Sequence, residues 1–124
     1  MRRTTSRPAG VQAGEGPFRA CGADLLHALI DDLTNRIRAP VIAARFHHGV
    51  AALIEAGCVR LRDSSGLDTV ALSGGVFQNM LLLHATVTRL EARGFRVLTH
   101  SGVPCNDGGI SLGQAVIAAA RDRR

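Results

Sequence analysis

The second half of the chain constrains the fold most, because short apolar strands and longer helices alternate there. Residues 69–72 form an apolar run, and residues 95–99 alternate in polarity as a half-buried strand does. Between them, residues 77–93 have the spacing of an amphipathic helix, and residues 110–120 predict a closing helix. A strand–helix–strand unit of this length predicts two parallel strands joined by a crossover.

The first half predicts two helices behind a basic leader. Residues 1–22 are rich in Arg, Gly, Thr and Pro and have no apolar period, which predicts a disordered leader. Apolar residues at helical spacing over residues 23–37 predict one helix, and Pro40 either ends it or opens the next. Residues 41–56 predict a second helix that Gly57 terminates before a loop.

The expected fold is one α/β domain over residues 23–124, in the order helix, helix, strand, helix, strand, helix. Two strands are too few for a parallel sheet that is covered on both faces. We therefore expect an incomplete sheet, completed by another chain or by sequence outside these 124 residues. Alone, such a fragment is expected to self-associate or to be poorly soluble, because a strand edge and apolar surface stay open.

Composition excludes several kinds of site. All 15 basic residues are arginines, so no lysine is present to bind a phosphate or form a Schiff base. The arginines are spread out apart from clusters at the two ends, which favours a solvated basic surface over a nucleic-acid partner. The three widely spaced cysteines indicate a reducing cytoplasm, and no apolar run is long enough to span a membrane.

A glycine turn after the first strand is one candidate binding site. Ser73, Gly74 and Gly75 end the strand, and Asn79 follows near the start of the next helix. Glycines let a ligand approach the backbone, and free amides at a helix start attract an anion. Asn79 could donate to a ligand or cap the helix. A tight turn without any ligand explains the same residues equally well.

A second glycine turn follows the second strand. Residues 103–109 contain Asn106 and Asp107 ahead of two glycines and the closing helix. The Asp107 carboxylate could bind a metal, accept a proton or, as the simplest alternative, cap the helix. Ligands of open α/β sheets bind at the carboxyl ends of the strands. We therefore expect the two turns to face one cleft, where a nucleotide phosphate and a metal would fit.

The histidines and Cys105 are weaker candidates. His47 and His48 are adjacent on a helix and point in different directions, so they cannot chelate one metal together. His84 falls on an exposed or half-exposed helical position, and His100 ends a strand, so each is interpreted as structural or solvated. Cys105 lies in the expected cleft without an identifiable base nearby, which favours a small buried side chain over a nucleophile.

Four motifs in order resemble HypF-type carbamoyltransferases, the maturation factors of [NiFe] hydrogenases. They are IAARFHHGVA (42–51), VALSGGVFQNMLLL (70–83), RLEARGFRVLTH (89–100) and VPCNDGGISLGQAVIA (103–118). The similarity covers roughly Asp24 to Arg121. It implies the C-terminal part of a TsaD-like, actin-like ATPase domain. Such enzymes make carbamoyl adenylate from carbamoyl phosphate and ATP and transfer the carbamoyl group to the C-terminal cysteine of HypE.

The resemblance also assigns roles to residues. Ser73, Gly74, Gly75 and Asn79 match the family's nucleotide-contacting turn, so ATP or carbamoyl adenylate is the implied ligand. Asp107 matches the Asp of the Asn-Asp-Gly-Gly motif, which implies a ligand of a divalent metal (Fe, Zn or Mg). The implied partners are HypE and upstream HypF-type domains, and a membrane or nucleic-acid partner is not expected. No catalytic residue is implied for this chain.

The sequence departs from the family pattern in three respects. The upstream HxxxH pair that also holds the family's metal is absent, and so are the upstream domains, including the first half of the actin-like fold. Met80 stands where a basic residue is common. We therefore expect a carbamoyltransferase fragment that is inactive without the missing domains. The alternatives are a non-catalytic remnant that binds a nucleotide or a partner, and an RNA binder acting through the Arg-rich leader.

Overall fold

The computed structural model describes residues 20–123. The leader predicted for residues 1–22 therefore lies outside the described residues, apart from its last three. The elements in chain order are α1 (Ala23–Thr34), α2 (Ala39–Ser65), β1 (Thr69–Ala71), η1 (Gly75–Gln78), α3 (Met80–Ala92), β2 (Arg96–Leu98), η2 (Asp107–Gly109) and α4 (Ile110–Asp122). The predicted order of helices and strands is observed, with the short 3-10 helices η1 and η2 added after the strands.

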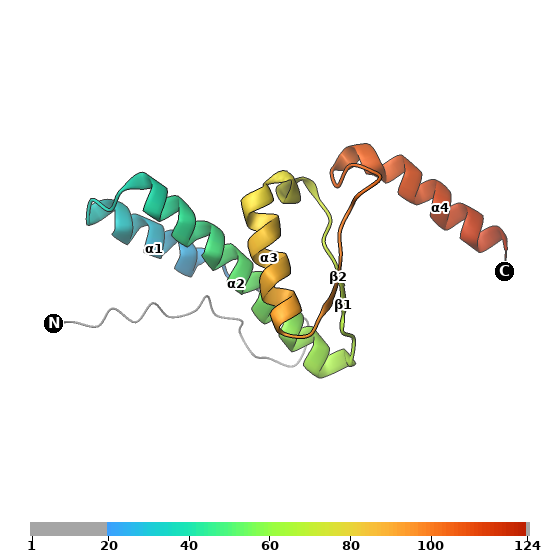
Figure 1. The fold of residues 1–124 in the computed structure, drawn as a ribbon, viewed down its shortest axis with the longest axis horizontal. Helices are drawn as coiled ribbons and strands as arrows, with labels where there is room; N and C mark the ends of the chain where they lie inside the picture. Colours follow the sequence, from blue (N-terminus) through green and yellow to red (C-terminus); the bar gives the residue numbers. More distant parts are fainter. Residues whose placement is uncertain (1–19, 124) are drawn as a thin grey trace.

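The two strands form a small parallel sheet, as predicted. Val70 of β1 pairs with Val97 of β2, and these two central residues are half-buried while their neighbours on both strands are exposed. α3 lies along the covered face, with α2 behind it (Figure 1). Leu72, Leu90 and Phe95 form the centre of the core there. The outer face of the sheet has no cover among the described residues, and Leu98 is 44% exposed.

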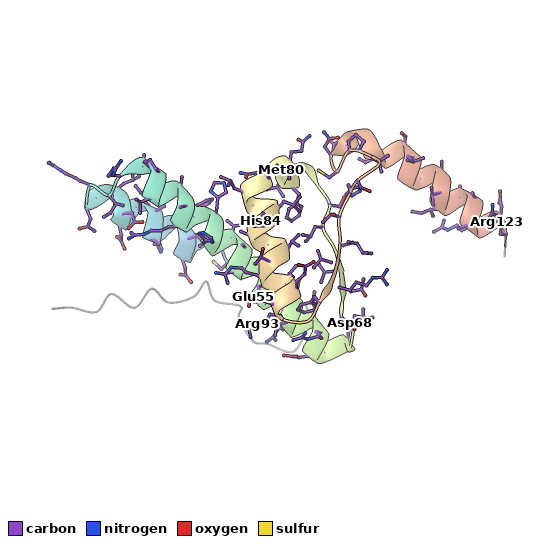
Figure 2. All side chains as sticks on the ribbon, viewed as in Figure 1. Glu55, Asp68, Met80, His84, Arg93 and Arg123 are labelled. Carbon is purple, nitrogen blue, oxygen red and sulfur yellow. The ribbon has the colours of Figure 1, made fainter. Side chains whose placement is uncertain are left out.

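An ion-pair cluster joins α2 to α3 beside this core. Glu55 is buried on α2 and accepts hydrogen bonds from Arg89 (2.8 Å) and Arg93 (2.6 Å) of α3. Figure 2 shows Glu55 and Arg93 side by side where the two helices meet. Burial acts to raise the pKa of Glu55, but the hydrogen bonds and charges of the two arginines outweigh it and leave the pKa below its ordinary value. The glutamate is therefore ionised and holds the helices together.

The predicted end of the second helix at Gly57 is wrong. α2 continues to Ser65 and ends where Gly66 adopts a left-handed conformation (φ 74°). The extra two turns are stabilised by tertiary packing, because Cys58 and Val59 contact the core. A helix tolerates an interior glycine at a cost of about 1 kcal/mol, which such packing offsets.

The other helix boundaries shift by a few residues. α1 ends at Thr34, and Pro40 is in the first turn of α2, so this proline opens the next helix rather than ending the first. α3 begins at Met80 and not at residue 77, because η1 and the capping residue Asn79 stand between the turn and the helix. α4 is two residues longer than predicted.

α4 is the least integrated element. It extends away from the other helices and from the sheet (Figure 1), and none of its residues is buried. Several of its apolar side chains are more than 45% exposed, namely Ile110, Leu112, Val116 and Ile117. The position of α4 therefore depends on η2 and on the turn that precedes it.

Candidate functional site

The two glycine turns lie side by side at one edge of the sheet, the edge at which both were expected. The backbone N–H of Gly74, after β1, donates to the carbonyl oxygen of Cys105, after β2, at 2.7 Å. An added Cβ on Gly75 would lie 3.9 Å from the Cβ of Asn106, so the two turns also run close together next to this hydrogen bond. The parallel pairing of β1 and β2 brings both turns to the same edge of the sheet.

The first turn presents backbone donors beside open space. Gly74 has φ 105°, a conformation that requires glycine, whereas an added Cβ on Gly75 would meet nothing closer than ordinary contact distance. The N–H groups of Gly75 and Val76 have no hydrogen-bond partner among residues 20–123. Two successive unpaired amides next to an unobstructed glycine suit an anion such as a phosphate.

Asn79 caps α3. Its Oδ1 accepts from the backbone N–H groups of Leu81 (3.1 Å) and Leu82 (3.2 Å). These amides are therefore not free to bind an anion, unlike the amides of Gly75 and Val76 in η1. Of the two roles left open for Asn79, capping is the one that its side-chain oxygen performs.

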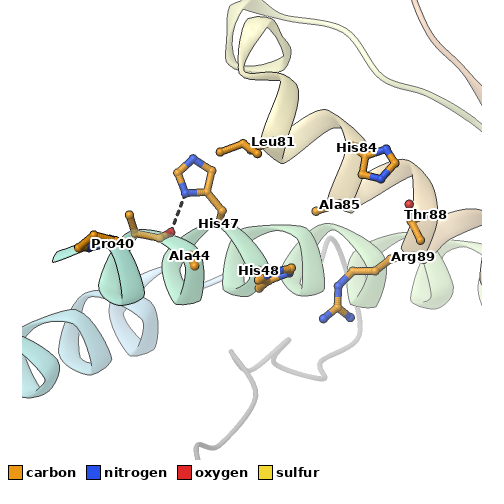
Figure 3. A pocket seen from close by; sticks show the side chains of 10 residues that line it. Pro40, Ala44, His47, His48, Leu81, His84, Ala85, Thr88 and Arg89 are labelled. Carbon is orange, nitrogen blue, oxygen red and sulfur yellow. Dashed lines mark hydrogen bonds between the residues drawn. The ribbon is translucent and has the colours of Figure 1, made fainter. Parts of the chain in front are cut away.

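The Asn79 amide nitrogen contacts a histidine from the first half of the chain. Nδ2 of Asn79 lies 2.7 Å from Nε2 of His47 on α2, and Nδ1 of His47 lies 2.7 Å from the carbonyl oxygen of Ala43. Figure 3 shows the second of these bonds, with His47 standing beside Leu81 at the start of α3. His47, interpreted from the sequence as structural or solvated, is thus tied directly to the candidate site.

In the second turn, Asn106 rather than Asp107 is the capping residue. Oδ1 of Asn106 accepts from the N–H of Gly108 at 3.0 Å, and its carbonyl oxygen accepts from Gly109 at 3.0 Å. Asp107 is exposed, and its carboxylate makes no hydrogen bond or ion pair within the described part of the chain. The simplest alternative for Asp107, helix capping, is therefore taken by its neighbour, which leaves the carboxylate available to a ligand.

A serine–histidine pair at the strand ends was not foreseen. Nε2 of His100, just after β2, lies 3.0 Å from Oγ of Ser73, just after β1. The pairing register of the strands brings together these two residues, which are 27 positions apart. Position at the two strand ends was the one sequence signal that could have linked them. The pair adds a hydroxyl and an imidazole to the edge that carries both turns.

A metal centre is not formed by the described residues alone. No group of three or more His, Cys, Asp or Glu side chains lies close enough together to hold an ion in residues 20–123. His47, His48 and His84 instead line a groove of about 590 Å³ between α2 and α3, together with alanines and Leu81 (Figure 3). Asp107 supplies one carboxylate and no more. Cys105, interpreted from the sequence as a small buried side chain, is half-buried in the second turn.

Comparison with known proteins identifies the family. A family model described as carbamoyltransferase, Kae1-like domain, second subdomain, matches residues 2–114. This chain belongs to the HypF carbamoyltransferase family. The match begins well ahead of Asp24, where the resemblance was expected to start, and therefore takes in most of the predicted leader.

Three HypF relatives illustrate the similarity. Carbamoyltransferase HypF2 of Cupriavidus necator is 42% identical over 98 residues, which are 79% of this chain and 12% of the relative. Carbamoyltransferase HypF of Synechocystis is 39% identical over 80 residues, 64% of this chain and 10% of the relative. The crystal structure of full-length HypF in its phosphate- and nucleotide-bound form matches with a TM-score of 0.82 at 36% identity, over 92% of this chain and 15% of that one.

The chain thus corresponds to a small part of a HypF carbamoyltransferase. It spans between 10% and 15% of the length of these three proteins. The α/β architecture with a small parallel sheet agrees with the Kae1-like subdomain that the family model describes. None of the helices within residues 20–123 is long and apolar enough to cross a membrane.

Proposed function

We propose that this chain supplies one wall of the nucleotide site in a HypF-type carbamoyltransferase. The hydrogen bond from Gly74 N–H to the Cys105 carbonyl carries the proposal, because it holds both glycine turns at one edge of the sheet. That edge combines the unpaired amides of Gly75 and Val76 with the free carboxylate of Asp107. We take the actin-like ATPase arrangement, of which this segment would be the C-terminal part, as the setting of the site.

The proposed ligand is ATP or carbamoyl adenylate. Phosphate oxygens would accept hydrogen bonds from the amides of Gly75 and Val76, where the open face of Gly75 allows a close approach. Ser73 and its partner His100 lie next to these amides and could contact the same group. The similarity to a HypF structure in a nucleotide-bound form supports this ligand class.

Asp107 is proposed as one ligand of a divalent metal such as Fe, Zn or Mg. Its exposed carboxylate fits that role, whereas the remaining ligands must come from sequence outside the described residues or from water. A bound cation would offset the negative charge of the phosphates. A single carboxylate holds such an ion weakly, so we expect little metal binding by this chain alone.

The reaction proposed for the complete enzyme is carbamoyl transfer to the C-terminal cysteine of HypE. The cysteine thiolate attacks the carbamoyl carbon of carbamoyl adenylate, the bond from that carbon to the AMP phosphate oxygen breaks, and AMP leaves. The products are S-carbamoyl cysteine and AMP, and the proton of the thiol goes to solvent or to a base. Because this chain spans only 10–15% of its relatives, we propose that it is inactive without the other HypF-type domains.

Substitution of Gly75 tests the nucleotide site. Gly75→Val should fold normally, because its Cβ meets nothing closer than 3.9 Å, yet its methyl groups fill the space in which a phosphate would lie. Calorimetric titration of the 124-residue chain with ATP and Mg²⁺ should show weak saturable binding that this variant reduces at least about tenfold. The matched control is Gly22→Val, also in open space but at the start of α1.

Two outcomes of this titration would count against the proposal. Equal ATP affinity of Gly75→Val and the unsubstituted chain would show that the ligand does not use this turn. If no binding is seen, the titration is repeated with the upstream domains of a HypF carbamoyltransferase added in trans. Failure to bind ATP there as well, or failure to restore labelled carbamoyl transfer to HypE, would overturn the proposal.

Substitution of Asp107 tests the metal role separately. In the reconstituted mixture, Asp107→Asn should keep the shape of η2 but weaken the dependence of carbamoyl transfer on added divalent metal, because a neutral amide is a poorer ligand than a carboxylate. We expect the metal concentration for half-maximal transfer to rise about tenfold or more. Asp122→Asn at the end of α4 is the control. An unchanged metal dependence in Asp107→Asn would exclude Asp107 as a ligand.

A further inference from the structure

The hydrogen bonds around His47 determine which of its ring nitrogens carries the hydrogen, and they also determine the orientation of the Asn79 amide. The Ala43 carbonyl can only accept, so Nδ1 of His47 carries the hydrogen and donates to it. Nε2 of the ring then accepts from Nδ2 of Asn79, which can only donate. Oδ1 of Asn79 is turned the other way, toward the N–H groups of Leu81 and Leu82. A flipped amide would lose the cap of α3 and the bond to His47 together.

This network anchors the downstream end of the segment between β1 and α3, residues 73–79, which we call the nucleotide turn. The N–H of Asn79 donates to the carbonyl oxygen of Val76 at 3.2 Å, so Asn79 is the last residue tied into η1. At the upstream end, the backbone N–H of Gly74 donates a hydrogen bond to the carbonyl oxygen of Cys105. The unpaired amides of Gly75 and Val76 therefore lie between two fixed points, one on the second glycine turn and the other on α2.

We propose that His47 is a positioning residue for the nucleotide turn. This rests on the proposed function and adds to it a residue from outside the two turns. His47 acts through Asn79, and with both ring nitrogens engaged it has no free lone pair for a metal. By holding Asn79, it keeps the amides of Gly75 and Val76 in the orientation that a phosphate needs. The entropy cost of ordering this turn when the nucleotide binds is therefore smaller.

Two substitutions separate positioning from general stability. His47→Leu removes the acceptor for Asn79, whereas His47→Gln can return a side-chain oxygen to the position of Nε2. We expect His47→Leu to weaken ATP binding about five- to tenfold, the effect of one lost hydrogen bond, and His47→Gln to restore most of it. His48→Leu, the neighbouring histidine of the same groove, is the matched control and should bind like the unsubstituted chain. Melting temperatures are measured for all variants.

A double substitution tests whether His47 works through Asn79. Asn79→Ser keeps an oxygen that caps α3 but has no amide nitrogen to donate to His47. In that background, His47→Leu should have no further effect on the dissociation constant for ATP. Independent effects of the two substitutions would contradict the proposal. So would ring ¹⁵N shifts that place the hydrogen of His47 on Nε2, a measurement that requires no nucleotide and applies even to variants with altered stability.

The outcomes distinguish this inference from the proposed function. If ATP binds and Gly75→Val abolishes binding, but His47→Leu changes affinity less than about twofold at an unchanged melting temperature, only the role of His47 is wrong. If His47→Leu does not fold, the comparison rests on His47→Gln and Asn79→Ser, whose affinities must then differ from each other. If Gly75→Val has no effect, the nucleotide site itself is wrong, and the positioning role fails with it.

Discussion

At the scale of single residues, two asparagines perform the same structural task at the two turns. Asn79 accepts backbone hydrogen bonds at the start of α3, and Asn106 accepts one at the start of η2. Each satisfies helix-terminal amides that would otherwise attract an anion. The chemistry left at the site therefore comes from the amides of Gly75 and Val76 and from the carboxylate of Asp107. In the second turn, this division of roles arises because the side chain of Asn106, and not that of its neighbour Asp107, accepts the backbone hydrogen bond.

The buried glutamate of α2 makes stability depend on pH. Glu55→Gln should lower the free energy of unfolding at neutral pH by about 1–3 kcal/mol, because two charge-assisted hydrogen bonds are weakened. The pKa of Glu55 is lowered in the folded state, so its contribution is present above its ordinary value of 4.5 and is lost as the pH falls through the lower, folded value. Denaturant melts of Glu55→Gln and of the unsubstituted chain, from neutral pH to below pH 4.5, measure the effect.

The control for this substitution is Glu91→Gln, which changes an exposed carboxylate on α3. Its stability difference should stay within about 0.5 kcal/mol at every pH. The difference between Glu55→Gln and the unsubstituted chain should shrink on acidification. A difference that is constant with pH would show that the ionised form of Glu55 does not hold the two helices together.

At the scale of elements, the interface between α2 and α3 carries the site. Thr86 of α3 is completely buried, and its hydroxyl has no hydrogen-bond partner in the described residues. An unsatisfied buried hydroxyl is costly, so Thr86→Val should raise the free energy of unfolding by about 1 kcal/mol. Thermal and denaturant melts measure this change, and the exposed Thr88→Val should change stability little. Destabilisation by Thr86→Val would indicate that the hydroxyl is in fact hydrogen bonded.

The sequence was sufficient to predict the element order and the meeting of the two turns. Periodicity reveals strands and helices, and parallel strands necessarily bring their carboxyl ends to one edge. The sequence did not predict that α2 continues beyond Gly57, because packing of Cys58 and Val59 on the core outweighs the low helix propensity of glycine. Nor did it reveal the bond between His47 and Asn79, which joins residues 32 positions apart through the packing of α2 on α3.

At the scale of the whole molecule, more large apolar side chains are exposed than buried among residues 20–123. They gather on α1, on α4 and around the start of α3, while the buried core lies between the sheet and the α2–α3 pair. A monomeric protein rarely leaves so much apolar surface in water, so such surface marks a place for another partner or another part of the same protein. This agrees with the small share of the HypF relatives that the chain spans.

The apolar side chains of α4 should drive self-association of the isolated chain. Ile117 is 55% exposed on α4, and Ile117→Asp should shift the chain toward the monomer without lowering its melting temperature, because the residue contacts no core. Sedimentation velocity over a range of concentrations measures the association. Gln114→Asp adds the same charge without removing an apolar side chain. Equal association in both variants, or a monomeric unsubstituted chain, would contradict the prediction.

The bond between Gly74 and Cys105 also has a mechanical consequence for α4. Cys105 is followed directly by the residues that cap η2, and α4, none of whose residues is buried, begins where η2 ends. Because Gly74 donates to Cys105 and a Cβ on Gly75 would lie 3.9 Å from the Cβ of Asn106, the first glycine turn is joined to the residues at the start of α4. A displacement of the first turn would therefore also change the direction in which this helix points.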